Sequence, residues 1–337
     1  KVSQTKGLSM DVKLRAQSLI EFGLPRNWIA LVVERFAQGG ITSLTSNELY
    51  MIVKRVCNIL RTEASVIDVR GDCRVVGSLH GSIESLQAIF RTYGWPSDVC
   101  YVFLGDYLAT IDDKIQTNVF VLLLIFKVVY PKHILLLRGA SECEHCAADM
   151  GLLDLLTTSF TASLYREFKS VFKYLPLAAR ANGIHLMCNA SLSLKRGNLL
   201  DLEQVVRPCT ICHRDGIMRL LARQPSRLGD HTLQADPLED FDEGETEDVC
   251  EAISFMKRSN MKICVRNEGI EQSLAGGYNV EGRQCNVISI ASASNIRGQP
   301  CRGVVLAVHR NGASTLHPTD PKAAKPDVRL IMYCPNK

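Results

Sequence analysis

The sequence lacks an apolar run long enough to cross a membrane. The longest run, residues 119–130, is interrupted by Lys127, and it is well short of the roughly 20 residues that a membrane-spanning helix needs. We therefore expect a buried helix or strand there and no membrane span. No apolar stretch typical of a signal peptide follows Lys1. We expect an intracellular protein, in the cytoplasm or, because the chain does not begin with Met, in the mitochondrion or another organelle.

Excess charge is also scarce. Lys and Arg number 39 and Asp and Glu 35, so the net charge is only +4, which is too weak to indicate nucleic-acid binding by itself. The hydrophobic share of 46% and the charged share of 22% match ordinary globular proteins and exclude disordered and low-complexity chains. Basic side chains gather in residues 195–227, where RNA or an acidic partner could bind, although a solvated face is the default interpretation.

Cysteine, by contrast, is plentiful. The count of 13 is odd, the spacing is irregular, and several cysteines, such as Cys100 and Cys264, lie inside apolar runs. A buried thiol behaves as a small hydrophobic side chain, and disulfide frameworks are typical of secreted chains. The cysteines therefore predict a reducing compartment.

Hydrophobic periodicity predicts helices first and alternating strands and helices afterwards. Apolar residues recur every three or four positions over residues 11–22, 27–38 and 49–60, and Thr45 and Glu48 are typical of a helix start before the last of these. Short apolar runs between Gly-containing turns then predict strands over residues 66–69, 73–76, 99–104, 133–137, 183–188, 261–265 and 286–290. This alternation indicates one α/β domain.

Four of these runs end in small or polar residues. The first block is residues 77–81 (GSLHG), the second is 105–111 (GDYLATI), the third is 138–142 (RGASE), and residues 189–191 (NAS) follow the run at 183–188. In α/β proteins the carboxyl ends of strands form ligand sites. These segments therefore mark the candidate site.

In order and spacing, the three blocks resemble the GDxHG, GDYVDRG and RGNHE motifs of the phosphoprotein phosphatase family, the metal-dependent Ser/Thr phosphatases related to protein phosphatase 1. Residues 174–179 (YLPLAA) and 187–193 (MCNASLS) are similar to the family's CLPIAA and CHGGLS segments. The resemblance implies a calcineurin-like metallophosphatase fold of the α/β (α+β) class, with a central β-sandwich of two mixed sheets flanked by helices. It divides the chain into an N-terminal helical extension at 1–27, a degenerate phosphatase domain at 28–310 and an extended C-terminal tail at 311–337.

The chemistry of this family uses two divalent ions that share a bridging hydroxide, and the resemblance implies six ligand positions. His80 and Asp106 keep the family's residue. Ser78, Ala140 and Asn189 replace an Asp, an Asn and a His, and the last His position falls on Glu268. Serine and alanine cannot replace strong carboxylate or amide ligands, so we expect no dinuclear metal centre and no other cofactor.

The acid–base and phosphate-binding positions are altered as well. By the resemblance, Ser141 stands where the family has the His that protonates the leaving group, and Ala109 where it has the Asp partner of that His. Thr110 and Ala148 replace two phosphate-binding arginines, and Asn295 replaces a Tyr. Serine cannot act as a general acid near neutral pH, and losing the guanidinium groups removes a large part of the transition-state stabilisation. We therefore expect no catalytic residues.

Two cysteine motifs allow other interpretations. Residues 209–213 (CTICH) match the c-type haem attachment pattern, but the resemblance places them on a surface connection, so we expect no haem. Cys143 and Cys146 could form a zinc site with Cys209 and Cys212. Because the two pairs belong to different elements of the family fold, reduced thiols are the default interpretation.

The sequence therefore predicts a pseudophosphatase: a catalytically inactive protein that serves as a structural or scaffolding subunit of a larger complex through other protein subunits, with RNA as a further partner class. His80 and Asp106 are then held by hydrogen bonds. The alternative is a residual or altered phosphoesterase with a single metal at His80, Asp106 and Glu268, to which Asn189 could add a ligand.

Overall fold

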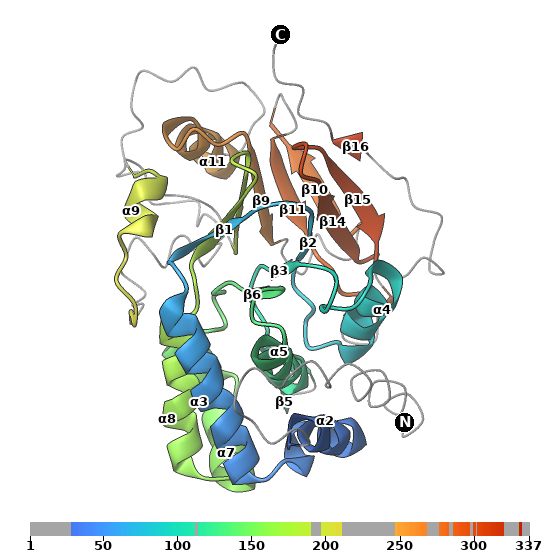
Figure 1. Cartoon of the computed structure of the whole chain (residues 1–337), viewed down its shortest axis with the longest axis vertical. Coiled ribbons are helices and arrows are strands. Elements are labelled where there is room, and N and C mark those ends of the chain that lie inside the picture. Colours follow the sequence, from blue (N-terminus) through green and yellow to red (C-terminus); the bar gives the residue numbers. More distant parts are fainter. Residues whose placement is uncertain are drawn as a thin grey trace.

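The computed structural model describes residues 28–111, 114–189, 197–210, 247–267, 276–282, 286–296, 299–300, 302–319 and 330–331. The helix predicted over residues 11–22 and the extension 1–27 lie outside these ranges. Figure 1 shows two β-sheets in the upper half of the view and a group of helices below them. Both sheets mix parallel and antiparallel strands.

The first sheet follows the order β1-β7-β8-β9-β11-β10. Its strands are β1 (Val66–Val69), β7 (Ala178–Ala181), β8 (His185–Cys188), β9 (Ile263–Asn267), β11 (Val287–Ile290) and β10 (Tyr278–Glu281). Strands β8, β9 and β11 run parallel to one another. Their carboxyl ends therefore meet at one edge of the sheet.

The second sheet follows the order β16-β15-β14-β2-β3-β6. Its strands are β16 (Leu330–Ile331), β15 (Ser314–Pro318), β14 (Val304–Val308), β2 (Cys73–Val76), β3 (Tyr101–Phe103) and β6 (Ile134–Leu136). Strands β2, β3 and β6 run parallel, so the three sequence blocks that follow them emerge at the same edge.

The sequence predicted most of these strands. Each of the seven predicted runs contains a strand, whereas β7, β10, β14 and β15 were not predicted from periodicity. Strand β15 belongs to the segment 311–337 that we expected to be an extended tail. It pairs with β14 over its full length, so the second sheet continues beyond residue 310.

The two sheets enclose an apolar core. Alternate residues of the strands point into it, among them Val75 and Leu306 from the second sheet and Ala179, Met187 and Val265 from the first. Two mixed sheets that pack face to face around such a core form a β-sandwich. This confirms the predicted fold class.

Helices cover the outer face of the second sheet. They are α2 (Trp28–Gly39), the short helix η2 (Gly40–Ser43), α3 (Ser46–Thr62), α4 (Ile83–Tyr93), α5 (Asn118–Val129), α6 (Glu144–Asp149), α7 (Leu152–Ser159) and α8 (Ala162–Tyr174). The predicted start of α3 is confirmed by a capping box. The Thr45 hydroxyl accepts the Glu48 N–H at 3.2 Å, and the Glu48 carboxylate accepts the Thr45 N–H at 2.8 Å.

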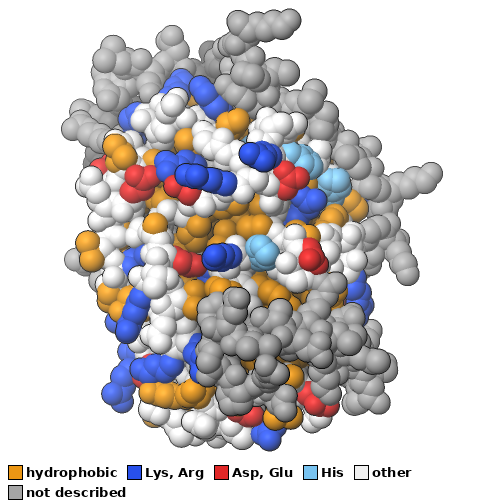
Figure 2. Space-filling view, in the orientation of Figure 1, with side chains coloured by type: hydrophobic (Ala, Val, Ile, Leu, Met, Phe, Trp, Pro, Cys, Tyr) orange, Lys and Arg blue, Asp and Glu red, His pale blue; other side chains and the backbone are white. Residues whose placement is uncertain are grey.

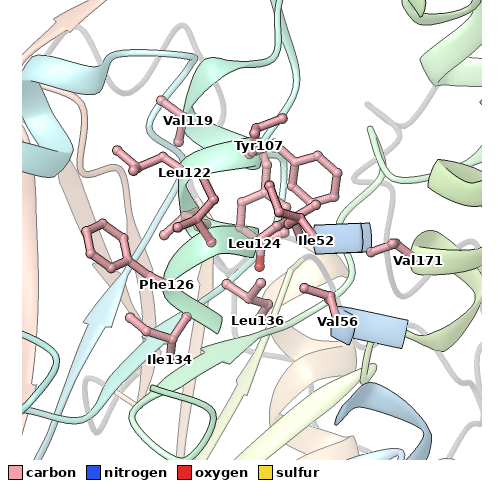
Figure 3. Close-up of a cluster of buried hydrophobic side chains, with 14 of the residues drawn as sticks. Ile52, Val56, Tyr107, Val119, Leu122, Leu124, Phe126, Ile134, Leu136 and Val171 are labelled. Atoms are coloured by element: carbon pink, nitrogen blue, oxygen red, sulfur yellow. The ribbon is translucent and has the colours of Figure 1, made fainter. Parts of the chain in front are cut away.

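Helix α5 lies at the centre of this layer and accounts for the longest apolar run. Figure 3 shows Val119, Leu122, Leu124 and Phe126 of α5 among side chains of α3, α8 and β6. A helix that is apolar on all sides is buried on all sides. None of the helices in the described part of the chain combines the length and hydropathy that crossing a bilayer requires.

The outer face of the first sheet carries two helices, α9 (Leu199–Glu203) and α11 (Glu247–Arg258). Leu202 of α9 and Phe255 of α11 pack on Leu186 and Cys264 of the sheet. Two small antiparallel pairs complete the described structure. They are β4 (Ala109–Ile111) with β5 (Lys114–Gln116), and β12 (Asn295–Ile296) with β13 (Gln299–Pro300).

His185 is an exception to the apolar core. It pairs across the sheet with Ala181 and Ile263, which both belong to the inter-sheet core, and neighbours across strands share a face. The side chain is fully buried, and neither ring nitrogen has a hydrogen-bond partner. Burial lowers the pKa of His185 to about 4, because the charged imidazolium loses its hydration.

His185 should therefore make the fold acid-sensitive. The pKa of His185 in the folded chain lies below its value near 6.5 in the unfolded chain. The unfolded chain therefore binds the proton more tightly, and the folded state loses stability as the pH falls below about 6.5. From about pH 7 to about pH 5 we expect a loss of about 2 kcal/mol in unfolding free energy. His185→Leu should abolish this loss in urea titrations, whereas His133→Gln, which is not in the core, should leave it. An equal pH dependence in wild type and His185→Leu would contradict the assignment.

Candidate functional site

The three sequence blocks meet at the carboxyl ends of β2, β3 and β6. A side-chain carbon at Gly139 would lie 2.2 Å from the Asp106 nitrogen, and one at Gly105 would lie 2.5 Å from the Gly139 nitrogen. The first block packs on the other sheet, since a carbon at Gly77 would lie 2.3 Å from the Ile290 carbonyl oxygen. These contacts are closer than any Cβ allows, so glycine is required at all three positions. We call the residues gathered here the strand-end site.

Asp106 lies at the centre of the hydrogen bonds of the strand-end site. Its backbone has a positive φ of 57°, a conformation that non-glycine residues rarely adopt outside functional or tightly constrained sites. Its Oδ1 accepts the Ser141 N–H at 3.0 Å. Its Oδ2 accepts the side-chain amide of Asn189 at 2.9 Å and that of Asn267 at 3.4 Å. Three N–H donors thus converge on the one carboxylate of the second block.

A second carboxylate, Glu142 of the third block, lies fully buried behind Asp106. Its Oε2 accepts the backbone N–H of Asp106 at 2.8 Å and of Gly139 at 2.9 Å. Its Oε1 accepts the Tyr107 N–H at 2.9 Å and the Ser141 hydroxyl. Burial, followed by the Asp106 carboxylate, raises the pKa of Glu142 to about 7 against the opposing effect of these hydrogen bonds. Glu142 therefore ties the second block to the third.

Sequence reasoning missed Glu142 because it searched for metal ligands and proton donors. Glu142 has neither role in the structure and acts only as an acceptor for four donors. A signal was present, however. Glu142 is an acidic residue close to the end of a buried strand, among small residues, and such a side chain needs buried partners.

Two asparagines bring the other sheet to Asp106. Asn189 follows β8 and also donates to the Leu104 carbonyl at 3.0 Å. Asn267 ends β9, and its backbone N–H donates to the Asn189 carbonyl at 3.0 Å. Both side chains are buried. The two β-sheets are thus joined by amide groups at the point where the predicted ligand positions meet.

Asn267 was not among the predicted site residues, and the neighbouring candidate Glu268 lies outside the described residues. Strand periodicity could have indicated Asn267. Ile263 and Val265 point into the inter-sheet core, and side chains two positions apart share a face. Asn267 continues this series at the end of β9.

Among the other predicted metal positions that the structure describes, Ser78, Ala140 and His80, only His80 carries a side chain that commonly binds metal ions. Ser78 is buried, and its carbonyl accepts the N–H groups of Ser292 and Ala293. Ala140 is half-buried and offers only a methyl group. His80 is half-buried with a positive φ of 46°. No group of three His, Cys, Asp or Glu side chains suited to a metal ion occurs in the ranges that the structure describes.

Four of the predicted acid–base and phosphate positions lie on β4, α6 and β12, and the fifth, Ser141, lies in the loop after β6. Ser141 donates its hydroxyl to Glu142. Ala109 and Thr110 lie in β4 of the β4–β5 hairpin, and Ala148 lies in α6. Asn295 begins β12, where it pairs with Pro300. None of these residues offers a cationic group or an acid that could serve a phosphoester.

A buried arginine links the third block to the predicted surface connection. Arg138 is almost fully buried. Its Nε donates to the Glu142 carbonyl at 3.2 Å, and its Nη1 donates to the Cys209 carbonyl at 2.8 Å. Its Nη1 also donates to the Cys209 sulfur at 3.6 Å. A buried guanidinium that binds the Cys209 sulfur opposes the zinc interpretation. Cys212, the fourth cysteine of that interpretation, lies outside the described residues.

The comparisons with known proteins agree with the fold. The chain belongs to the calcineurin-like phosphoesterase family, whose model matches residues 74–266. Among solved structures, it is similar to a protein serine/threonine phosphatase from Saccharomyces cerevisiae with similarity to human phosphatase PP5. The two are 20% identical, the match covers 92% of this chain and 100% of that chain, and the TM-score is 0.70.

Weaker likenesses occur among tyrosine phosphatases. A cold-active protein-tyrosine phosphatase of a psychrophilic Shewanella species is 15% identical, with 82% of this chain and 84% of that chain covered and a TM-score of 0.49. A mutant cold-active protein tyrosine phosphatase has the same identity and coverage and a TM-score of 0.50. At these identities the structural likenesses show the fold alone, and activity has to be argued from the strand-end site.

Proposed function

We propose that this chain is a catalytically inactive, degenerate relative of the phosphoprotein phosphatases and acts as a structural or scaffolding subunit of a larger complex. One observation carries the proposal. The Asp106 carboxylate accepts N–H donors from Ser141, Asn189 and Asn267. In a dinuclear centre, two cations would balance the negative charge of this carboxylate. Here backbone and side-chain N–H groups stabilise that charge instead.

The donor set does not fit a dinuclear centre. Hard and borderline ions need several carboxylate, imidazole or amide oxygen donors at one point. Ser78 and Ala140 offer no strong donor, and the Asn189 side-chain nitrogen faces Asp106, where it acts as a hydrogen-bond donor. We therefore expect no step of hydrolysis to proceed through paired metal ions here.

Proton transfer and phosphate binding lack their groups too. The Ser141 hydroxyl is already donated to a buried carboxylate, and a serine is a poor general acid near neutral pH in any case. Ala109, Thr110 and Ala148 carry no charge. These positions therefore offer a phosphoester neither a proton donor for its leaving group nor an arginine that binds its phosphate.

An intact fold with exposed apolar groups supports a role in assembly. Figure 2 shows apolar side chains gathered across the middle of one face, between groups of charged residues. Among the large hydrophobic side chains, Val206 is 83% exposed and Leu200 is 61% exposed. Contiguous apolar patches of the kind seen in Figure 2 are typical of protein contacts, whereas single exposed apolar residues are ordinary. We therefore favour protein subunits as partners.

RNA remains the other partner class, through the basic segment 195–227. In the part of this segment that the structure describes, Arg207 serves the fold. Its Nε donates to the Ser65 hydroxyl at 3.1 Å, and its other nitrogens donate to the carbonyls of Glu63 and Tyr174. An arginine held in this way contributes little to a phosphate-binding face, which weakens the RNA alternative.

Isolation of the native chain at physiological concentration tests the scaffolding role. We expect a tagged chain to be recovered in stoichiometric complex with other protein subunits, and that complex to resist ribonuclease. Recovery as a free monomer would contradict the proposal. Loss of the complex on ribonuclease treatment would instead favour RNA as the partner.

The alternative function, a phosphoesterase with a single metal at His80, Asp106 and Glu268, is favoured by one observation. The Asn267 Oδ1 is buried and has no hydrogen-bond partner, and the same side chain contacts Asp106. An orphan amide oxygen beside a carboxylate could serve one cation, which Asn189 or His80 would help to hold.

A phosphoesterase assay separates the two functions. With p-nitrophenyl phosphate or a phosphoserine peptide and added Mn²⁺, we expect no turnover above the protein-free blank, for wild type and for Asp106→Asn alike. Turnover that Asp106→Asn and His80→Ala abolish, and that the surface variant Asp154→Asn keeps, would overturn the inactive assignment and support the alternative.

A further inference from the structure

Two cysteines lie side by side at the start of α6, next to the strand-end site. Cys143 is the N-cap residue of this helix, and its sulfur accepts the backbone N–H of Cys146 at 3.3 Å. The neighbouring Cys143 side chain, followed by burial, raises the pKa of Cys146. Side chains three residues apart in a helical turn are about 5–6 Å apart at their Cβ atoms. A small shift therefore brings them to the spacing of a disulfide.

The pair differs in exposure. Cys143 is 2% exposed, whereas Cys146 is only half-buried. A small disulfide in solution can therefore reach Cys146 directly, while Cys143 is positioned behind it as a second thiol. Cys57, in contrast, is buried in the core of the helical layer, where a disulfide in solution cannot reach it.

The surroundings hold the pair in place. Glu142, immediately before Cys143, is fixed by four hydrogen bonds, and Arg138 binds the Glu142 carbonyl. The main chain on the amino-terminal side of Cys143 is thus held before any reaction.

We propose that Cys143 and Cys146 are a reversible thiol–disulfide exchange site whose oxidant is a low-molecular-weight disulfide of the glutathione class. The Cys146 sulfur, as thiolate, attacks one sulfur of the oxidant, which releases one thiol and leaves a mixed disulfide. The Cys143 sulfur then attacks the Cys146 sulfur and releases the second thiol. The pair loses two protons and two electrons, and the oxidant is reduced to two thiols.

This site does not depend on the inactive assignment. Its product would fix the helix start that follows Glu142, the residue on which the amides of Asp106, Tyr107 and Gly139 depend. Oxidation should therefore slow the hydrogen exchange of these amides and leave remote strands unchanged.

Equilibration of the full chain in glutathione buffers, followed by acid quenching, alkylation and peptide mass spectrometry, tests the proposal. We expect a Cys143–Cys146 bond, seen as the loss of two hydrogen atoms from their shared peptide. Its ratio to the reduced pair should rise about tenfold for each tenfold rise in [GSSG]/[GSH]², the law for an exchange that releases two thiols. Cys57 should stay reduced throughout.

Variants complete the test. Cys146→Ser should abolish the internal bond, and the control Cys100→Ser should keep it with an unchanged midpoint. The wild-type titration stands alone if a variant fails to fold. Absence of the internal bond at every buffer ratio, a stable mixed disulfide on Cys146, or a bond from either cysteine to Cys209 would overturn the proposal.

Discussion

Replacement of Glu142 by alanine is expected to lower the free energy of unfolding by about 3–4 kcal/mol. The change leaves the backbone N–H groups of Asp106, Tyr107 and Gly139 and the Ser141 hydroxyl without their acceptor, and each buried unpaired polar group costs about 1–3 kcal/mol. Relief of the buried carboxylate offsets part of the total. Urea unfolding at neutral pH measures the effect.

Two variants frame this expectation. Glu142→Gln keeps the shape of the side chain and one acceptor oxygen. It should therefore lower the free energy of unfolding by less, about 1–2 kcal/mol. Glu84→Ala removes an exposed glutamate and should change stability by less than about 0.5 kcal/mol. If Glu142→Ala unfolds at the same urea concentration as wild type, Glu142 is not the residue that ties the second and third blocks together.

Lys127→Met is expected to be comparably destabilising, by about 3–5 kcal/mol. Lys127 is fully buried in α5, and its ammonium pairs with Glu63 and donates to the carbonyls of Pro131 at 3.0 Å and Ile134 at 2.8 Å. Burial lowers the pKa of Lys127, whereas Glu63 acts in the opposite sense. Loss of the ammonium leaves a carboxylate and two carbonyls without their donor.

The matched control for Lys127 is a surface ion pair. Lys54 binds Glu167 at 2.9 Å, but its side chain is 44% exposed. Exposed pairs contribute about 0–1 kcal/mol, so Lys54→Met should shift the urea midpoint only slightly. Equal effects of Lys127→Met and Lys54→Met would show that the buried ammonium has no special role.

The fold could be predicted largely because its signals are local or repeated. Thr45 and Glu48 predict the start of α3 through a capping box, and the short apolar runs predict the parallel strands. Strand β7 was harder to predict, because the alanines of Ala178–Ala181 carry little strand propensity. Strand β15 holds polar Ser, Thr and His residues, and its pairing with the neighbouring strands β14 and β16 makes it a strand.

The sequence predicted where the strand-end site lies, but it did not predict the hydrogen bonds within that site. The resemblance placed Ser78, His80, Asp106, Ala140, Ser141 and Asn189 at the ends of neighbouring strands. It could not show that amides from Asn189 and Asn267 would bind Asp106, because hydrogen bonds across two sheets depend on strand register. Nor did Lys127 indicate its partner, since Glu63 is distant in sequence and meets it only after α3 and α5 pack.

Metal titration of the purified chain tests the central claim most directly. Because the Asp106 carboxylate is bound by three N–H donors, calorimetric titration with Mn²⁺ or Zn²⁺ should give no site stronger than about 1 mM. Asp106→Asn should give the same trace as wild type. Two tightly bound ions per chain, both lost in Asp106→Asn, would contradict the account.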